Sequence, residues 1–278
     1  MKNAVLIIGS GSIANKHLTN LISLKKKVYV FSSGKNINNN FTLKLQKKIN
    51  ITNSIAKIKK KIDFAIVANA TNNHIPQINV LAKNQIHIFC EKPISNNIKS
   101  LKKTRAVLKK NKIIFSTNYQ LHQHNLFKFI KSKIKKKEIL SVSLRVGQHI
   151  KNWRKKSPNS SSYFLDSHKG GGVIFELIHE VNLINSLFGN IIDIKTLVKK
   201  SDIYQNVEDI AISSFSTSSN ILGGLYQDMI SELPFRTIEI ICKNKNYHFD
   251  LLANEVKIFY KNKTKFIKFQ KSNCQQMF

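Results

Sequence analysis

The stretch AVLIIGSGSIANKHLTNLI, residues 4–22, runs directly from an apolar segment through a glycine turn into a helical pattern. A continuous apolar run of this kind is typical of a strand buried on both faces of a parallel sheet. The turn reads G-x-G-x-x-A, which lets the backbone approach a pyrophosphate while Ala14 packs the helix closely on the strand. A purely structural glycine turn is the alternative. The residues that we expect to contact a dinucleotide here are Gly9, Gly11, Ser12 and Ile13.

A second apolar segment, KVYVFSS at residues 27–33, predicts the next strand of the same sheet. Its end is where a dinucleotide-binding fold normally places an acidic residue for the adenosine ribose. This place holds Ser32 and Ser33, then Gly34 and Lys35, so no carboxylate would repel a 2′-phosphate. We expect Ser32, Ser33 and Lys35 to contact a cofactor that is NADP or NAD, with NADP bound at least as well. Lys35 also fits the general abundance of lysine in the chain.

Two more strand-and-loop units follow, with apolar runs at residues 64–68 and 86–90. In an open parallel sheet, ligands bind beyond the carboxyl ends of the strands. The loop NATNNH follows the first run, and EKP follows the second, with its proline fixing the exit of the chain. A surface ion pair at a strand end is the alternative for the charged residues of EKP. The residues that we expect at the cofactor in this region are Ala70, Thr71, Glu91 and Lys92.

The length of 278 residues exceeds the usual size of a single domain. We predict a dinucleotide-binding Rossmann domain at residues 1–120 and a substrate-binding and oligomerisation α/β domain at residues 121–278. Alternating strand patterns with few helices predict an antiparallel sheet in the second domain. Such a sheet offers a wall for substrate and a surface for a homo-oligomer, a dimer or tetramer. The predicted strands are LSVSLRVGQH, DIAISSFSTSS, NILGGLYQDMI, FRTIEIICKN and EVKIFYKN.

The charge is strongly unbalanced, with 46 basic residues against 15 acidic ones and a net charge of +31. A balance of this kind can indicate binding to nucleic acid or to an anionic membrane. The lysines are scattered along every segment, however, and no basic stripe alternates with aromatic residues. Lys, Ile and Asn are the three commonest residues of the chain, so a bias toward A/T-rich codons explains the charge more simply. We expect weak attraction to polyanions and no specific nucleic-acid partner.

Cysteine usage and hydropathy indicate the cytoplasm. The three cysteines form no C-x-x-C pair and leave an odd count, which favours a reducing compartment over a disulfide scaffold. The N-terminal apolar run stops at Gly9, too early for a signal peptide. No later apolar run approaches the roughly eighteen residues of a membrane span, so we expect no membrane partner.

Three consecutive glycines, residues 170–172, precede a helical pattern that carries Glu176, His179 and Glu180. Spacings of three and four would place these side chains on one face of a helix. The rest of this segment is strongly apolar, so we expect the helix to be buried rather than to present a solvated polar face. Buried clusters of acids and histidine tend to be functional.

Four motifs together resemble the glucose-fructose oxidoreductase, inositol dehydrogenase and MocA (Gfo/Idh/MocA) family over nearly the whole chain. They are GSGSIANKH at 9–17, ANATNNH at 68–74, CEKP at 90–93 and GGGVIFELIHEVNLINSLFG at 170–189. The resemblance implies a Rossmann domain followed by an α/β domain with an open, mainly antiparallel sheet. It also places His74 in the loop beside the cofactor. Within the family, VGQHIKNWR and ELIHE resemble the branch found with cell-surface glycan genes.

A dehydrogenase acting on a carbinol needs a base for the hydroxyl proton, and Lys92 and His179 are the candidates. An ammonium desolvated beside a cationic nicotinamide has a lowered pKa, which suits Lys92 for proton exchange. The resemblance implies the same role for the lysine of EKP, and an Asp and a His spaced D-x-x-x-H on the helix. Glu176 stands at the Asp position, while Glu180 stands at the His position and His179 one residue earlier. We read His179 as proton shuttle or hydroxyl ligand, Glu176 as its orienting partner and Glu180 as a sugar-hydroxyl acceptor.

A metal site is the rival interpretation of Glu176-x-x-His179, because this pairing occurs in di-iron bundles. Those bundles need a second helix of the same kind, and the sequence shows none, so we expect no metal. The other histidines lack ligand spacing and are expected in turns or at the surface. They include His17, His122, His124 and His168.

Substrate recognition is expected from aromatic residues, on which sugars stack, and from an arginine that could hold a carboxylate or phosphate. A role in the core or at the surface is equally open for each of them. The candidates are Tyr119, Trp153, Arg154 and Tyr163.

Taken together, the residues and the resemblance predict an NAD(P)-dependent oxidoreductase acting on a carbinol of a sugar, sugar nucleotide or polyol. Cell-surface polysaccharide metabolism is the expected context. A catalytically silent dinucleotide-binding regulator or scaffold is the alternative, and a polyanion-binding module is a third hypothesis. The departures from the family pattern are the missing acidic ribose residue, the Glu in place of Asp, and an end at NCQQMF where relatives usually continue into a helix. We therefore expect a shortened C-terminal domain.

Overall fold

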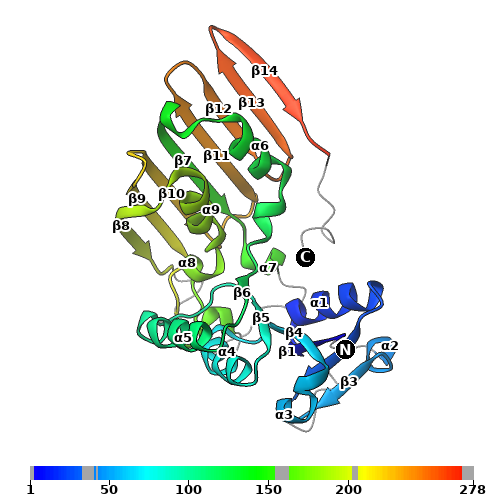
Figure 1. Cartoon of the computed structure of the whole chain (residues 1–278). Coiled ribbons are helices and arrows are strands. Elements are labelled where there is room, and N and C mark those ends of the chain that lie inside the picture. The colour runs from blue at the N-terminus through cyan, green and yellow to red at the C-terminus, as the bar shows by residue number, and fades with distance from the viewer. Residues whose placement is uncertain (1–2, 33–40, 42, 154–162, 202–205, 271–278) are drawn as a thin grey trace. The chain divides into compact units, whose positions relative to one another are not determined.

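The computed structural model describes residues 3–32, 41, 43–153, 163–201 and 206–270 (Figure 1). It divides into two compact units, Met1–Asn118 and Tyr119–Met277, which are called the N-terminal and C-terminal units below. Each unit is built around its own sheet.

The N-terminal unit contains a sheet of six parallel strands in the order β3-β2-β1-β4-β5-β6. Strands β2 and β3 follow one another on one side of β1, and β4, β5 and β6 follow one another on its other side. The direction in which strands are added therefore changes at β1, as in doubly wound folds. The strands are β1 (Ala4–Ile8), β2 (Lys27–Phe31), β3 (Ile49–Thr52), β4 (Ile62–Val67), β5 (His87–Cys90) and β6 (Phe115–Thr117). The helices are α1 (Ser12–Ser23), α2 (Leu43–Gln46), α3 (Ile55–Ile58), α4 (His74–Lys83) and α5 (Ile98–Lys110).

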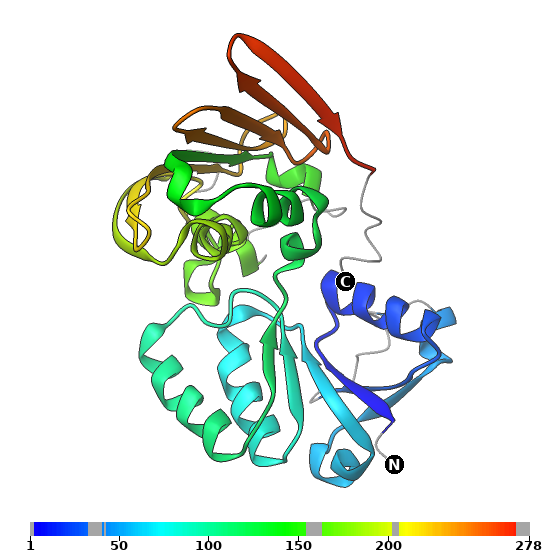
Figure 2. The ribbon, with the colours of Figure 1, turned by 45° about the horizontal axis from the view of Figure 1, so that its top comes forward.

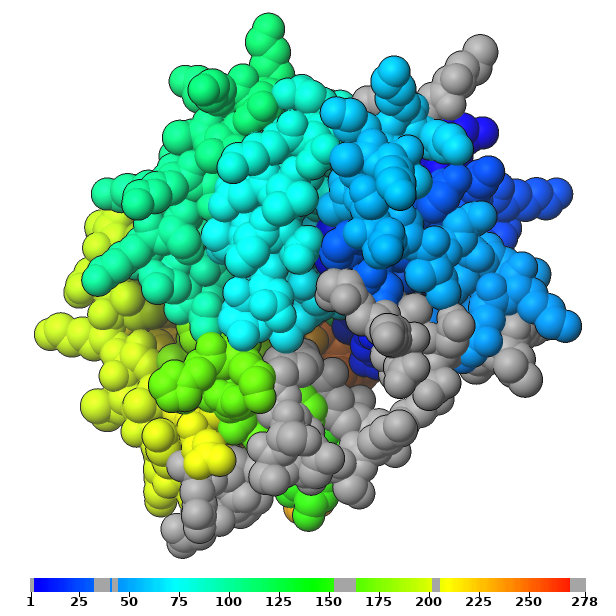
Figure 3. All heavy atoms as spheres, turned by 90° about the horizontal axis from the view of Figure 1, so that it is seen from below, coloured from blue at the N-terminus to red at the C-terminus, as the bar shows by residue number. Residues whose placement is uncertain are grey.

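Strand β1 is buried on both faces, which explains its continuous apolar sequence. Val5 and Ile7 pack into one cluster with residues of α1, and Leu6 and Ile8 pack into another with residues of α4. Helices α4 and α5 lie side by side on the unit (Figures 2 and 3). The alternation of side chains along a strand thus supplies a core to each face of the sheet.

The C-terminal unit contains an eight-stranded sheet in the order β14-β13-β12-β11-β7-β10-β9-β8. Every neighbouring pair is antiparallel except β7 and β10, which are parallel. The predicted α/β fold class, with a parallel sheet followed by a mainly antiparallel one, is confirmed. The strands are β7 (Ile139–Gly147), β8 (Ile191–Lys199), β9 (Ile210–Thr217), β10 (Leu222–Asp228), β11 (Phe235–Cys242), β12 (Asn246–Asp250), β13 (Glu255–Tyr260) and β14 (Lys263–Lys268).

Helices α6 (Asn125–Lys133) and α9 (His179–Phe188) cover one face of this sheet (Figure 1). Leu126 and Ile130 of α6 and Leu183 and Leu187 of α9 join one buried cluster with inward-facing side chains of the strands, such as Leu144. The alternation of buried and exposed residues along β9 and β11 follows from this one-sided cover. Two short helices, α7 (Ile150–Trp153) and α8 (Val173–Glu176), lie between β7 and α9 in the chain.

Several strands are absent from the expectations drawn from sequence: β3, β8, β12 and β14. In β8, almost every side chain is exposed, so burial imposes no alternating pattern on its sequence. The sequences of β12 and β14, NYHFD and KTKFIK, are rich in polar residues that rank low as strand formers. These strands form because they pair with neighbouring strands. The local sequence pattern does not reveal such pairing.

Because β1 is buried on both faces, we expect substitutions in it to lower the stability of the N-terminal unit. Leu6→Ala removes a fully buried side chain and should lower the free energy of unfolding of the N-terminal unit by roughly 2–5 kcal/mol. Leu24→Ala is the matched control, because Leu24 is 68% exposed and should change that free energy by only about 0.5 kcal/mol. Urea unfolding followed by circular dichroism measures both. Equal effects of the two substitutions would contradict the assigned core.

Candidate cofactor and catalytic site

The glycine turn predicted to bind a dinucleotide follows β1 directly. Gly9 has φ of +125°, and a Cβ there would lie 2.4 Å from the carbonyl oxygen of Ala68, so only glycine fits. Gly11 caps α1 and has open space where its Cβ would project. The first backbone N–H groups of α1 have no partner within the helix. The turn therefore fits a pyrophosphate, with one glycine packed against the segment that follows β4 and the other open to a ligand.

The end of β2 carries no carboxylate at the residues that the structure describes there, up to Ser32. Ser32 is partly buried, and its backbone N–H donates to the carbonyl oxygen of Thr52 at 2.9 Å. Ser33 and Lys35, which we also predicted to contact the cofactor, lie outside the described residues.

The loop after β4 is fixed through His74, the first residue of α4. Its Nδ1 lies 2.8 Å from the carbonyl oxygen of Pro93, and its Nε2 lies 3.0 Å from that of Asn69. Burial lowers the pKa of His74, although both carbonyl contacts oppose the shift. A neutral imidazole has a single N–H and therefore donates to one of the two oxygens. His74 thus joins the loop after β4 to the segment after β5.

Glu91 follows β5 and is buried, with its side chain only 11% exposed. Its Oε1 accepts hydrogen bonds from Nε2 of His17 at 2.6 Å and from Nδ2 of Asn118 at 2.8 Å. Burial alone would raise the pKa of Glu91, but these hydrogen bonds together lower it below its ordinary value. The backbone N–H of Glu91 also donates to the carbonyl oxygen of Val67 at 2.9 Å.

Two expectations from sequence are corrected by this arrangement. His17 is 2% exposed and binds Glu91, so its assignment to a turn or the surface was wrong. His124 is also buried, where it caps α6 by accepting from the backbone N–H of Leu126. The alternative reading of EKP as a surface ion pair fails as well, because the partner of Glu91 is a buried histidine. Asn118 was missed altogether.

The described cofactor-site candidates of the N-terminal unit share one edge of the parallel sheet. Strand β1 pairs with β4, and β4 pairs with β5, so the segments after these strands are neighbours. Lys92 is partly buried and lies between Glu91 and Pro93, joined to the latter by a cis peptide bond. The candidates at this edge are Gly9, Gly11, Ser12, Ile13, Ala70, Thr71, His74, Glu91 and Lys92.

In the C-terminal unit, the predicted single helix from the three glycines to Phe188 is two helices. The first, α8, ends at Glu176, and α9 begins at His179. Between them, the carbonyl oxygen of Leu177 accepts from Nε2 of Gln227 at 2.8 Å, which satisfies it outside a continuous helix. Gly172 starts α8 with φ of +108°. The prediction that Glu176, His179 and Glu180 occupy one helix was therefore wrong.

The three side chains around this break are all buried. The ring of His179 contacts Tyr119 edge-on, with centroids 6.1 Å apart. Tyr119 also stacks on His122, whose Nε2 lies 2.6 Å from Oδ1 of Asn182. The structure thus brings together two of the predicted substrate-contacting residues, His179 and Tyr119.

Glu180 forms a buried ion pair that sequence reasoning missed. Its Oε1 accepts from Nε of Arg236 on β11 at 2.7 Å. Its Oε2 has no hydrogen-bond partner among the described residues. The sequence did contain a hint of this pair. Only four of the 46 basic residues are arginines, and arginine is the preferred partner of a buried carboxylate, so each arginine was a candidate partner.

Three substrate candidates cannot be placed. Arg154 lies outside the described residues, as do the side chains of Trp153 and Tyr163. Within the described ranges, no group of three or more His, Cys, Asp or Glu side chains could hold a metal ion. None of the helices described has the length and apolar character that crossing a membrane requires.

The N-terminal unit matches one known family. Residues 4–119 match the Gfo/Idh/MocA family, described as an oxidoreductase family with an NAD-binding Rossmann fold. A curated relative, 2,7-anhydro-N-acetylneuraminate hydratase from Escherichia coli (strain K12), is 24% identical over 151 residues. The match covers 54% of this chain and only 40% of that relative.

Solved structures are similar over almost the whole chain. UDP-N-acetylglucosamine 3-dehydrogenase from Acidithiobacillus ferrooxidans has a TM-score of 0.80 at 13% identity, over 99% of this chain and 85% of that one. A levoglucosan dehydrogenase in complex with NADH has a TM-score of 0.81 at 14% identity, over 98% and 80%. Biliverdin reductase from Synechocystis sp. PCC 6803, in complex with biliverdin and NADP+, scores 0.81 at 10% identity, over 100% and 88%. At these identities the similarity shows the fold.

The lowered pKa of Glu91 predicts a pH-dependent stability. A carboxylate with a depressed folded pKa contributes stability above its unfolded value, near 4.3, and loses it as pH falls through the folded value. Glu91→Gln should therefore destabilise the N-terminal unit by about 1.5–3 kcal/mol at pH 7. The difference from the unchanged protein should shrink toward pH 3.

Urea unfolding at several pH values measures this difference. Asp63→Asn is the matched control, because Asp63 is an exposed carboxylate on β4 of the same unit. That substitution should have little effect on the free energy of unfolding at pH 7. A constant difference between the Glu91→Gln variant and the unchanged protein at all pH values would contradict the assigned ionised, paired carboxylate.

Proposed function

We propose, on the premise that residues 4–119 belong to the Gfo/Idh/MocA oxidoreductase family, that this chain is an NAD(P)-dependent oxidoreductase. The substrate is a carbinol of a sugar, sugar nucleotide or polyol. The observation that carries the proposal is the Lys92 segment, fixed by buried hydrogen bonds at the same sheet edge as an open glycine turn. The similarity in fold to a UDP-N-acetylglucosamine 3-dehydrogenase and a levoglucosan dehydrogenase supports the substrate class.

The cofactor fits the residues present. Gly9 and Gly11 with the start of α1 would hold the pyrophosphate, and the end of β2 offers no carboxylate against a 2′-phosphate at Ser32. When bound, the nicotinamide supplies the acceptor or donor of hydride. The absence of a carboxylate at this strand end suits NADP at least as well as NAD.

Lys92 is anchored on both sides. Glu91, before it, is held by His17 and Asn118, and the carbonyl oxygen of Pro93, after it, lies 2.8 Å from Nδ1 of the buried His74. A proton-transfer group has to be held within hydrogen-bonding reach of the reacting hydroxyl. We assign to Nζ of Lys92 the acceptance of the hydroxyl proton as the carbinol carbon is oxidised, and its return in the reverse direction.

In the C-terminal unit, we assign substrate contact and proton shuttling to His179, with Glu176 as orienting partner and Tyr119 as a stacking ring. Glu180 keeps one oxygen without a hydrogen-bond partner in the described part of the chain, which is consistent with acceptance from a sugar hydroxyl. Arg236 holds the other oxygen and thereby fixes the direction of the carboxylate.

Assembly and cellular context extend the proposal. The face of the large sheet opposite α6 and α9 exposes apolar side chains, including Ile212, Leu222 and Phe266, which would be covered in a homodimer or tetramer. Cys90 and Cys242, the cysteines in the described part of the chain, are free thiols, in keeping with the cytoplasm. We place the reaction in cell-surface polysaccharide metabolism.

A catalytically silent dinucleotide-binding regulator or scaffold is the second candidate. It is favoured by two departures, Glu176 in place of the family Asp and the one-residue offset of His179. The two functions differ in whether any sugar changes the redox state of bound cofactor.

The decisive experiment begins with native mass spectrometry of the freshly purified chain, which should detect bound NADP(H) or NAD(H). Sugar nucleotides and sugars are then screened for a change in absorbance at the reduced-nicotinamide band. Lys92→Ala and His179→Ala should each lower turnover by about 10²-fold or more while cofactor affinity changes little. Cofactor binding without turnover of any sugar would favour the silent regulator, and absence of any cofactor binding would end both proposals.

The two glycines of the turn should behave differently. Gly9→Ala places a methyl group against the Ala68 carbonyl and should prevent stable folding of the N-terminal unit. Gly11→Ala has room for its methyl group and should change the free energy of unfolding by less than about 1 kcal/mol. It should nevertheless weaken NADP by about tenfold or more, a loss of about 1.4 kcal/mol per factor of ten. Isothermal titration calorimetry checks this, and unchanged affinity would exclude the turn as the pyrophosphate site.

A further inference from the structure

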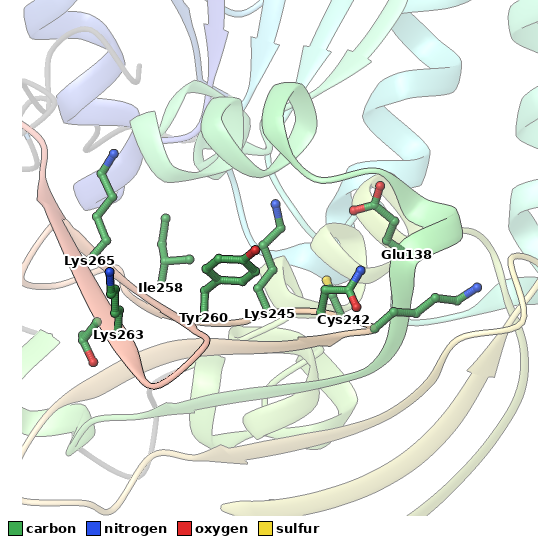
Figure 4. A pocket seen from close by; sticks show the side chains of 10 residues that line it. Glu138, Cys242, Lys245, Ile258, Tyr260, Lys263 and Lys265 are labelled. Atoms are coloured by element: carbon green, nitrogen blue, oxygen red, sulfur yellow. The ribbon is translucent and has the colours of Figure 1, made fainter.

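The C-terminal unit has a cavity of about 750 Å³ at one end of its large sheet (Figure 4). Its lining comes from Glu138, the turn between β11 and β12, and the hairpin of β13 and β14. Small-molecule pockets typically measure roughly 300–1,000 Å³, so this volume suits a ligand larger than a single phosphate. The cavity shares no residue with the glycine turn, the EKP segment or the residues around the α8–α9 break.

The strand register explains why both apolar and basic side chains line the cavity. Lys265 pairs with Ile258 across β13 and β14, and Lys263 pairs with Tyr260. Residues directly opposite each other in antiparallel strands project from the same face. Lys245, Tyr260 and Lys265 accordingly rise from the same side of the sheet (Figure 4). The cavity therefore combines an apolar floor, at Ile258 and Tyr260, with ammonium groups around it.

The charge around the cavity exceeds what composition supplies. Four of its ten lining residues are lysines, against 46 basic residues in the whole chain of 278, and the single acid is Glu138. Lysines on an edge strand protect against aggregation, which accounts for those of β14. That cause does not extend to the lysines of the β11–β12 turn. The four lysines are Lys243, Lys245, Lys263 and Lys265.

Lys245 is held in place at this cavity. It interacts with Tyr247, chiefly through a hydrogen bond that raises the pKa of the ammonium, and its Nζ lies 5.6 Å from the centre of the Tyr247 ring. It therefore stays protonated at neutral pH. Like charges gathered at one cavity repel one another, and an anion placed among them converts this repulsion into attraction.

We propose that this cavity binds a polyanionic small molecule with a planar ring, of the nucleoside diphosphate class. The lysines hold the phosphates, for which ammonium groups are common partners. Tyr260, which is 45% exposed, and Ile258, which is partly buried, contact the ring, because the apolar surface that they still expose favours burial against it. This site is independent of the proposed oxidoreductase reaction.

The test uses the full chain saturated with NADP and titrated calorimetrically with ADP, inorganic pyrophosphate and adenosine in 150 mM NaCl. ADP should bind most tightly, pyrophosphate more weakly and adenosine least. Lys245→Gln combined with Lys263→Gln should weaken ADP by about tenfold or more, which is about 1.4 kcal/mol. The matched control, Lys102→Gln with Lys103→Gln on exposed positions of α5, removes the same charge and should leave ADP affinity within about twofold.

Tyr260→Leu separates the contribution of the ring from that of the phosphates, since it should weaken ADP but not pyrophosphate. Hydrogen exchange on the unchanged chain should show ADP protecting residues 243–245 and 261–265. Equal weakening in the pocket and control variants would reduce the effect to general electrostatic attraction and overturn the proposal. Protection confined to the glycine turn at residues 9–14, or no binding of any probe up to millimolar concentration, would overturn it as well.

Discussion

A single buried carboxylate organises the edge of the N-terminal unit's sheet where β4 and β5 end. Glu91 continues from β5, bonds through its backbone to β4, and accepts through Oε1 from α1 and from the residue after β6. An ionised carboxylate removed from water costs several kcal/mol unless donors replace the lost solvation. His17 and Asn118 are those donors. The burial of Glu91 therefore requires α1, β4, β5 and the end of β6 to be correctly placed relative to one another. Lys92, the next residue in the chain, is fixed in position by the same hydrogen bonds.

Much of the fold could be predicted from local pattern, because local burial dictated the sequence. The uninterrupted apolar run of β1 reflects cores on both of its faces, and the alternation in β9 and β11 reflects cover on one face. Strands β8 and β14 lie at the edges of the large sheet, where most side chains meet solvent. Their sequences therefore carry little information about strand formation, and their pairing depends on neighbours.

The site shows the same division between local and distant causes. Three features could be found from the sequence, because each is a short run of neighbouring residues. They are the glycine turn, the EKP segment and the acid-histidine segment. The partners that fix them are distant in sequence: His17 lies 74 residues from Glu91, and Arg236 lies 56 residues from Glu180. The break between α8 and α9 likewise involves Gln227, 50 residues from Leu177. The helical periodicity around Glu176 does not reveal that contact, so the sequence predicted one continuous helix.

The parallel pairing of β7 with β10 has a consequence for how the C-terminal unit assembles. Strands β8 to β10 form one antiparallel meander and β11 to β14 another, and each meets only β7 at the centre of the sheet. Both meanders consist of sequential hairpins, whereas β7 must close long loops to reach either of them. Such non-local closure is slow, so the two meanders should form early and the central strand should complete the sheet last. During synthesis, β7 emerges before both of its partners and stays exposed until the ribosome has delivered them.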